Sequence, residues 1–374
     1  MAIPSEVDII THKVIQPRVI QDNFFLASAF WAAMRRKGRF IPFGGGSYIA
    51  SPFLYRGLQA NAYSPGDEFF PERRNIISQF VLNPKFYIGF AVEQLEDLEV
   101  HVKGPNAVFS LIRMDLAALV LSMTSTIAVA FHKHGQAISG DDRSQHINGW
   151  VEALNDGVSP SYDGRAYASY GGQTRSEVGD VLNSVPFYNG TATGQTAPLT
   201  YPRFVEEYLK ASFGQMQPDL ILSSKGVIAD LEAQMQRQQV YVQANDPWYG
   251  LYSGVKHKKA IVLHDDLWPS ARYGRNAEYG DFTTSSFTFA SAGVPTSFAA
   301  EMPSNGTTLN VGEVMGMFNT DTWDVILSDS KLFSFGWTGW ETAQTNTRAV
   351  GKMPAAINLR CNGNRYNRQI FGIS

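Results

Sequence analysis

Two pairs of side chains have the types that bind metal ions or transfer protons. His132 and His134 lie two residues apart in a segment with helical character, so their rings would point to different faces, whereas a spacing of four would let both reach one metal. Asp265 and Asp266 are adjacent after an extended segment, so their carboxylates would point to opposite sides. We interpret the histidines as cations at a helix end and the aspartates as a turn, and predict no metal and no cofactor.

Two other motifs could support catalysis or phosphate binding. Cys361, the single cysteine, is a nucleophile only beside an activating base, and a half-buried thiol on a strand is the simpler interpretation. Residues 44–47 read Gly-Gly-Gly-Ser, but no Lys follows in the phosphate-loop pattern and no helix begins there, so a bend is favoured. No set of residues has the composition of an active site, so we expect a protein that is not an enzyme.

One dense basic cluster closes a short predicted helix and comprises Arg35, Arg36, Lys37 and Arg39. Three interpretations stay open: the cluster contacts phosphates, it pairs with Asp67 and Glu68 of a neighbouring subunit, or it is a solvated helix end.

The composition limits the class of protein. Of 374 residues, 44% are hydrophobic and 17% charged, which is enough for a substantial core in roughly two or three domain-sized units. The formal net charge of -3 gives no general basic field, so any contact with DNA has to be local or weak. The lone cysteine excludes an internal disulfide, and the first residues lack the apolar core of a secretory signal, so we expect a reducing cytoplasm.

Residues 105–134 predict one long helix, with Pro105 at its start, Gly135 after its end and no internal glycine or further proline. Its apolar residues recur every three or four positions, which predicts one buried face. We take the core of this face to be Leu111, Leu116, Leu119, Val120, Met123 and Ile127. The uncharged part, residues 116–131, is shorter than the ~20 residues that span a bilayer, so we predict a buried helix and no membrane contact.

Three segments precede this helix. Residues 1–22 read as an extended arm, and residues 23–38 as a short helix capped by Asp22 and Asn23 and closed by Gly38. Residues 39–83 read as a long two-stranded excursion, with strands at 48–53 and 75–81. Such a pair is marginal in water, so it needs another surface to lie on. A strand at 85–92 and an acidic turn at 93–99 follow.

A second compact unit follows the helix, and its order of helices and strands is typical of an α+β or α/β fold. We predict helices at 202–214 and 227–239, strands at 218–223, 255–263, 314–319, 323–327 and 332–337, and a terminal strand pair within 355–373. Residues 270–309 read as a surface insertion, and 338–352 as a polar loop.

This order of elements resembles the major capsid proteins of tailed double-stranded DNA bacteriophages, which have the Hong Kong ninety-seven type fold. Local motifs agree: residues 108–135 followed by Ile-Asn-Gly-Trp at 147–150 look like the spine helix and its step into the axial domain. Two further segments look like parts of the family's axial domain: Tyr-Gly-Gly at 170–172 with Arg175 and Ser176, and Pro-Asp-Leu-Ile at 218–221. The end of the chain, from Ala356 to Gly372, is similar to the family's last strand. The resemblance covers nearly the whole chain except 270–309.

The resemblance implies an α+β fold with these parts: N-arm 1–22, short helix 23–38, E-loop 39–83, peripheral domain 84–145 with spine helix 105–134, axial domain 146–319 with insertion 270–309, peripheral strands and loop 320–353, and a terminal strand 354–374 returning to the axial domain. Charged residues on the short helix and E-loop are then candidates for contacts between subunits: Arg35, Arg36, Lys37, Arg56, Asp67, Glu68, Arg73 and Arg74.

The implied function is self-assembly into hexamers and pentamers of an icosahedral phage head around the genome. The implied location is the virion, after assembly in the cytoplasm of the host bacterium. Scaffolding, portal and decoration proteins are the implied partners, beside weak non-specific contact with packaged DNA. No scaffolding segment of ~100 residues precedes the arm, so a separate scaffold or none is expected. An encapsulin-like nanocompartment shell and a cytoplasmic α/β enzyme stay as alternatives.

Some members of this fold cross-link their subunits through an E-loop lysine and a partner asparagine, with a glutamate promoting the reaction. Here residues 38–84 contain no lysine, and no Asp or Glu follows Glu341. We therefore expect particles held together without covalent bonds. Mature particles boiled in detergent should run as monomers on a denaturing gel, and a ladder of covalent oligomers would contradict this expectation.

Overall fold

A computed structural model gives the fold. It describes residues 28–62, 64, 67–68, 73–94, 111–138, 141–142, 144–235, 240–241, 255–265, 267–268, 270, 286–288, 306–342 and 348–374. Four of the predicted segments lie wholly or partly outside these ranges. They are the arm 1–22, most of the acidic turn 93–99, the first residues of the long helix and most of the insertion 270–309.

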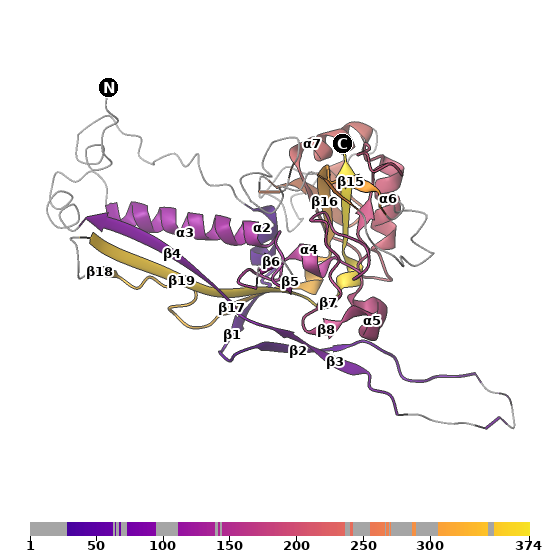
Figure 1. The fold of residues 1–374 in the computed structure, drawn as a ribbon, viewed down its shortest axis with the longest axis horizontal. Coiled ribbons are helices and arrows are strands. Elements are labelled where there is room, and N and C mark those ends of the chain that lie inside the picture. The colour runs from indigo at the N-terminus through magenta and orange to yellow at the C-terminus, as the bar shows by residue number, and fades with distance from the viewer. Residues whose placement is uncertain are drawn as a thin grey trace.

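The first large sheet is long and narrow. Its central strand, β19, pairs along one edge with β17 and β18 and along the other with β4, all antiparallel, while β1 joins β17 in parallel. Helix α3 lies along β4 on one face of this sheet (Figure 1). The elements are β1 (Phe40–Phe43), β4 (Lys85–Gln94), α3 (Leu111–Ala130), β17 (Trp323–Ser328), β18 (Trp340–Thr342) and β19 (Arg348–Cys361).

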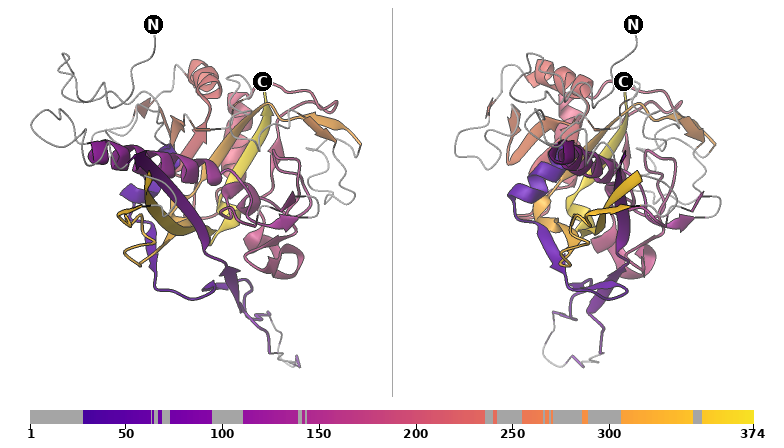
Figure 2. Two further views of the ribbon diagram at one scale, coloured as in Figure 1. Left: turned by 60° about the vertical axis from the view of Figure 1, so that its left-hand side comes forward. Right: turned by 90° about the vertical axis from the view of Figure 1, so that its left-hand side faces the viewer.

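The second large sheet is mixed and forms the core of a more compact unit. Its order is β11 (Val240–Tyr241), β12 (Val255–His257), β13 (Ala260–His264), β10 (Leu220–Ser223), β16 (Glu313–Phe318), β20 (Arg368–Ile373) and β9 (Phe187–Tyr188). Helices α6 (Tyr201–Lys210) and α7 (Lys225–Met235) pack on one face through a cluster that includes Phe204, Leu231 and Met317. The other face contributes to the largest core, around Trp150, Trp268 and Phe318. The two units lie side by side in Figure 1, and α3 is seen end-on in the right-hand view of Figure 2.

Shorter elements complete the described chain. The hairpin strands are β2 (Ile49–Leu54) with β3 (Ile77–Leu82), β5 (Ala137–Ile138) with β6 (Asp141–Asp142), β7 (Ser169–Tyr170) with β8 (Gln173–Thr174), and β14 (Ser286–Thr288) with β15 (Thr308–Asn310). The short helices are α2 (Ala29–Arg36), α4 (Trp150–Ala153) and α5 (Arg175–Val178), with 3-10 turns η2 (Gly179–Leu182), η3 (Thr320–Thr322) and η4 (Asn364–Tyr366).

Helix α2 begins later than the sequence predicts. Its N-cap is Ser28, whose side chain accepts a hydrogen bond from the Trp31 amide, so the proposed caps Asp22 and Asn23 were wrong. A distant residue also caps it, because the Asp265 carboxylate accepts from the Ala29 amide at 2.8 Å. Burial raises the pKa of Asp265 to about 6. Gly38, with φ +66°, follows the helix as predicted.

Helix α3 ends four residues before the predicted His134. After Ala130 the main chain turns away from the helical pattern, and the Phe131 and Lys133 carbonyls accept from the Trp150 and Gly149 amides. His132 was expected to be a helix-end cation, and this was wrong. Its ring is buried and accepts from Trp150 Nε1 at 2.7 Å, and burial lowers its pKa to about 3. His134 is also buried, with its Nε2 2.6 Å from an Arg165 guanidinium nitrogen.

The buried face of α3 is narrower than the predicted face. Leu119, Met123 and Ile127 are buried as predicted, and Leu116 is half-buried, but Val120 is 41% exposed and faces solvent. The side chain of Leu111 lies outside the described part. The helix approaches β4 at Gly89, where an added Cβ would lie 2.7 Å from Leu119 and 3.0 Å from Met123. Gly89 therefore sets the spacing between helix and sheet.

Several predicted strands differ from the observed ones. The single strand at 255–263 is the hairpin β12–β13, because Lys258 adopts φ +52° in the turn. Residues 332–337 form a turn rather than a strand, with Phe335 at φ +59°, and the expected polar loop 338–352 contains β18 and the start of β19. The terminal strands do not pair with each other: β19 lies in the first sheet and β20 in the second, between β16 and β9.

The burial of α3 predicts a sharp contrast between neighbouring substitutions. Leu119→Asp places a charge against β4 and should lower the free energy of unfolding by about 3 kcal/mol or more. Val120→Asp adds the same charge on the solvent side and should change it by about 0.5 kcal/mol or less. Urea denaturation followed by circular dichroism measures both. Equal effects of the two substitutions would contradict the observed helix orientation.

Candidate assembly surfaces

The hairpin β2–β3 projects from the body and carries exposed apolar side chains. Its six residue pairs run from Ile49 opposite Leu82 to Leu54 opposite Ile77, close to the two predicted strands. It points away from both large sheets (Figure 1). Leu54, Leu58 and Ile77 are all more than half exposed. An extended pair with apolar side chains in water is the feature expected of a segment that is covered by another molecule.

The base of this hairpin is fixed to its own chain. Phe80 is fully buried, stacks on Phe53 with ring centroids 4.2 Å apart, and meets Tyr170 edge to face. The Val81 amide donates to the Gly171 carbonyl at 2.8 Å. Gly171 has φ +55°, and an added Cβ would lie 2.7 Å from the Phe80 ring. The excursion therefore leaves the body in a defined direction.

The excursion begins after residue 43, and not at residue 39 as predicted. Residues 40–43 form β1, which pairs with β17 in the first sheet. The glycine-rich bend then follows, as predicted, with Gly45 at φ +111° and Gly46 at φ +114°. A bend of this kind needs glycine at both positions, because L side chains rarely adopt such angles.

A second exposed apolar surface lies on β4, which we call the β4 stripe. It consists of alternate residues on the face away from Leu119: Phe86 (66% exposed), Ile88 (49%), Phe90 (56%) and Val92 (51%). The alternation along the strand puts their neighbours, such as Gly89, on the face covered by α3. Four consecutive outward apolar residues are unusual on a strand that faces water.

The charged residues predicted to contact other subunits divide into those that pair within their own chain and those that stay exposed. Lys37 forms an ion pair with Asp219, and the Arg39 guanidinium lies 3.1 Å from Asp321, so both are held within the chain. Burial alone would raise the pKa of Asp321, but its hydrogen bond from Arg39 and the charge of Lys37 hold it below its usual value.

The remaining candidates are exposed, and their contact with another subunit stays a prediction. Arg35 and Arg36 lie at the end of α2, whereas the following residues lie on the excursion: Arg56, Asp67, Glu68, Arg73 and Arg74. Asp67 and Glu68 lie in the segment between β2 and β3, beyond the paired part of the hairpin.

The residues with catalytic potential do not form a reactive site. Cys361 is fully buried rather than half-buried, and burial raises the pKa of its thiol to about 12, so it is held as a neutral thiol. Within the described ranges, no group of His, Cys, Asp and Glu is arranged to hold a metal ion. No helix in the described part of the chain is long and apolar enough to span a membrane.

Comparison with known proteins finds similarity in structure and not in sequence. No family model matches the chain, and no curated protein matches its sequence. The capsid of cyanophage A-1(L) has a TM-score of 0.62 at 12% identity, with 96% of each chain covered. The capsid of a native GTA particle has a TM-score of 0.55 at 9% identity over the full length of both chains. An encapsulin complex from Synechococcus elongatus PCC 7942 has a TM-score of 0.55 at 8% identity, covering 100% of this chain and 97% of the other.

These likenesses show the fold. The chain has the α+β fold of Hong Kong ninety-seven type shell proteins, as the order of its elements predicted, and the match extends over nearly the whole length.

The packing at the base of the hairpin predicts which substitution loosens the hairpin from the body of the protein. Phe80→Ala removes a fully buried ring and should lower the free energy of unfolding by about 3 kcal/mol or more. It should also raise amide hydrogen exchange in β2 and β3, because their anchor is lost. Ile77→Ala, on the exposed part of the same strand, should change both by little. If exchange in the hairpin were the same in the two variants, the Phe80 anchor would be disproved.

Proposed function

We propose that this chain is the major building block of an icosahedral phage head, assembling into hexamers and pentamers around packaged double-stranded DNA. The observation that carries the proposal is the presence, on one fold of the shell-protein type, of two different exposed apolar surfaces: the hairpin β2–β3 and the β4 stripe. A contact between two different surfaces is head-to-tail, and such contacts close into rings when the rotation permits. Hexamers and pentamers are rings of this kind.

The two surfaces suit each other chemically. The hairpin of one copy extends beyond its own body, so it can lie on the β4 stripe of the next copy without unfolding either chain. Each stripe residue is already about half covered, and covering the rest would contribute about 1 kcal/mol per side chain. Four such side chains repeated around a ring give a contact that is weak in a pair and strong in a closed assembly.

This proposal assigns each part of the chain to a region of the shell-protein fold. Residues 44–83 act as the E-loop, α3 as the spine helix of a peripheral domain built on the first sheet, and the second sheet as the axial domain. The arm 1–22 and the exposed charges of the excursion add contacts between copies. Scaffolding, portal and decoration proteins are the partners, contact with packaged DNA is weak and non-specific, and the location is the virion after assembly in the host cytoplasm.

A nanocompartment shell is the second candidate, and the structural likeness to an encapsulin favours it. The contents of purified particles separate the two functions. Nuclease-protected DNA inside shells that carry a portal supports the phage head, whereas shells that hold protein cargo and no DNA support the nanocompartment.

The β4 stripe supplies a direct test of assembly. Phe90→Asp puts a charge in the middle of the stripe, so it should prevent closed shells while leaving the free energy of unfolding within about 0.5 kcal/mol of the wild type. Gln94→Asp adds the same charge at the end of the same strand and should assemble normally. Electron microscopy and sedimentation measure shell formation. Normal shells from the Phe90→Asp protein would rule out the stripe as the contact.

A further inference from the structure

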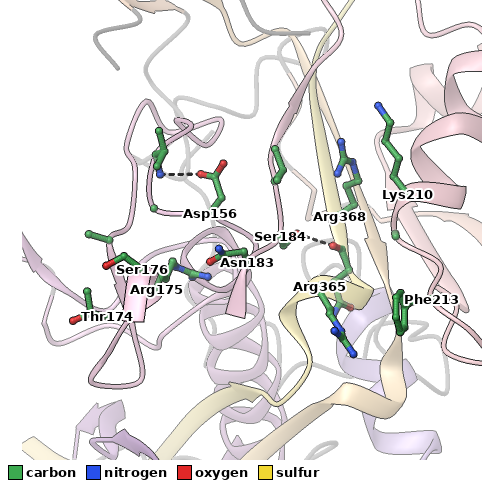
Figure 3. Close-up of a pocket in the computed structure, with 16 residues that line it drawn as sticks. Asp156, Thr174, Arg175, Ser176, Asn183, Ser184, Lys210, Phe213, Arg365 and Arg368 are labelled. Atoms are coloured by element: carbon green, nitrogen blue, oxygen red, sulfur yellow. Dashed lines mark hydrogen bonds between the residues drawn. The ribbon is translucent and has the colours of Figure 1, made fainter. Parts of the chain in front are cut away.

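Two further features of the described chain take no part in the proposed assembly contacts: a pocket in the compact unit and the outer edge of β4. The pocket has a volume of about 960 Å³, and its lining includes Arg365 and Arg368. The two guanidinium groups point away from each other (Figure 3), and Arg368 already pairs with Glu207, so they do not converge on one ligand. The edge of β4, in contrast, carries a row of aligned main-chain groups.

The direction of the main-chain groups of β4 follows from its pairing with β19. Opposite residues of antiparallel strands either exchange two hydrogen bonds or direct their groups to the two outer sides. Lys352 of β19 bonds away from β4, because its carbonyl accepts from the Thr338 amide at 3.0 Å. Its partner Phe90 therefore directs its N–H and C=O groups to the other edge of β4. Pro354, which has no N–H, lies opposite Ile88 and fits the same alternation.

In the part of the chain that the structure describes, no strand lies beside this outer edge. Alternation gives the same main-chain direction to Phe86, Ile88, Phe90 and Val92, which are the residues of the β4 stripe and are about half exposed or more. Their only sheet partner is β19, and they make no other backbone hydrogen bond within the described residues. The register with β19 runs from Lys85 to Gln94 with neither a bulge nor a proline in β4. The devices that usually protect an edge are therefore missing, and β4 is a template for a further strand.

The arm of the same chain has the composition of such a strand. Six of the nine residues 7–15 are Val, Ile or Thr, which are enriched in strands. The surrounding segment 5–16 contains no glycine or proline and lies between Pro4 and Pro17. Its length matches the ten residues of β4. The segment lies outside the described residues, so its assignment rests on its sequence and on where the arm joins the body.

The arm joins the described chain close to the start of β4. It leads into α2, whose Phe30 packs against Phe131 with ring centroids 5.5 Å apart. Four residues beyond Phe131, the Gly135 carbonyl accepts from Nζ of Lys85, the first residue of β4, at 3.2 Å. Residues 16–27 span up to about 40 Å when extended, which is enough to reach this point. Because β4 runs away from α2 (Figure 1), an arm that follows it lies antiparallel to it.

We propose that residues 7–15 of the arm form an antiparallel strand along the outer edge of β4 in the same chain. Each outward-directed residue of β4 offers one N–H and one C=O, and main-chain bonds to an added strand are the established way of occupying such an edge. The β-branched side chains of the arm add contacts with their neighbours across the two strands. The added strand becomes the new edge of the first sheet, so the arm can still meet a neighbouring copy. This proposal does not depend on the proposed assembly, because it concerns one chain.

Residue-resolved amide hydrogen exchange of the full-length chain, before and after assembly, tests the proposal. The odd-numbered amides of residues 87–91 bond to β19 whether or not the outer edge is occupied, so they report that the sheet is folded. The even-numbered amides of residues 86–92 face the outer edge. They should exchange within about tenfold of the odd-numbered amides if a strand covers them, and much faster if only water does.

Ile9→Pro and Ile10→Pro show whether the arm supplies the strand. Neighbouring residues of a strand direct their N–H groups to opposite sides, so one of the two substitutions removes a bond to β4 and the other does not. One variant should therefore raise exchange of the even-numbered amides at least about tenfold, and the other should raise it less. The matched control is Gln21→Pro, which makes the same change outside the segment and should exchange as the wild type does.

Protection of the even-numbered amides in the unassembled chain that one proline variant lowers supports the proposal. Rapid exchange of these amides in the wild type would overturn it, and so would protection that neither proline variant lowers. Protection that appears only after assembly would also overturn it, because a neighbouring copy would then supply the strand. None of these results bears on the shells themselves, so a failure here is distinct from a failure of the proposed assembly.

Discussion

Strand β4 imposes one constraint on the whole molecule, because α3 covers its inner face while the apolar side chains of its outer face remain about half exposed. On the inner face Gly89 allows α3 to approach until Leu119 and Met123 touch the strand. On the outer face the four side chains of the β4 stripe stay about half exposed. A folded chain leaves such a surface open at a cost in free energy, and that cost is recovered when another molecule covers it.

The relation between the two sheets depends on α2 rather than on the long helix alone. Phe30 of α2 packs against Phe131 after α3, Phe318 of β16 and Trp323 of β17, so one ring contacts elements of both units. Polar contacts act at each end of the helix, where Asp265 accepts from its first amide and Lys37 pairs with Asp219. A short helix thus joins the sheets, while α3 supports the edge of the first sheet.

Most of the exposed large apolar side chains in the described chain gather in one part of the molecule. The hairpin and the β4 stripe belong to the extended part, where apolar side chains face outward. In the compact unit, by contrast, Arg365 stacks over Phe213 and Arg368 pairs with Glu207.

The order and type of most elements follow from the sequence alone, because periodicity and glycine or proline signals are local. The long helix, the two strands of the excursion, the alternation of β4 and the glycine bend at residues 44–46 all follow from such patterns. Four features emerge only from the folded chain: where α3 ends, that His132 is neutral, that Asp265 caps α2, and that β19 and β20 belong to different sheets. Each of these depends on partners more than 15 residues away. Periodicity also could not assign Val120 to solvent, because an apolar residue beside a buried stripe looks the same whether another element covers it or not.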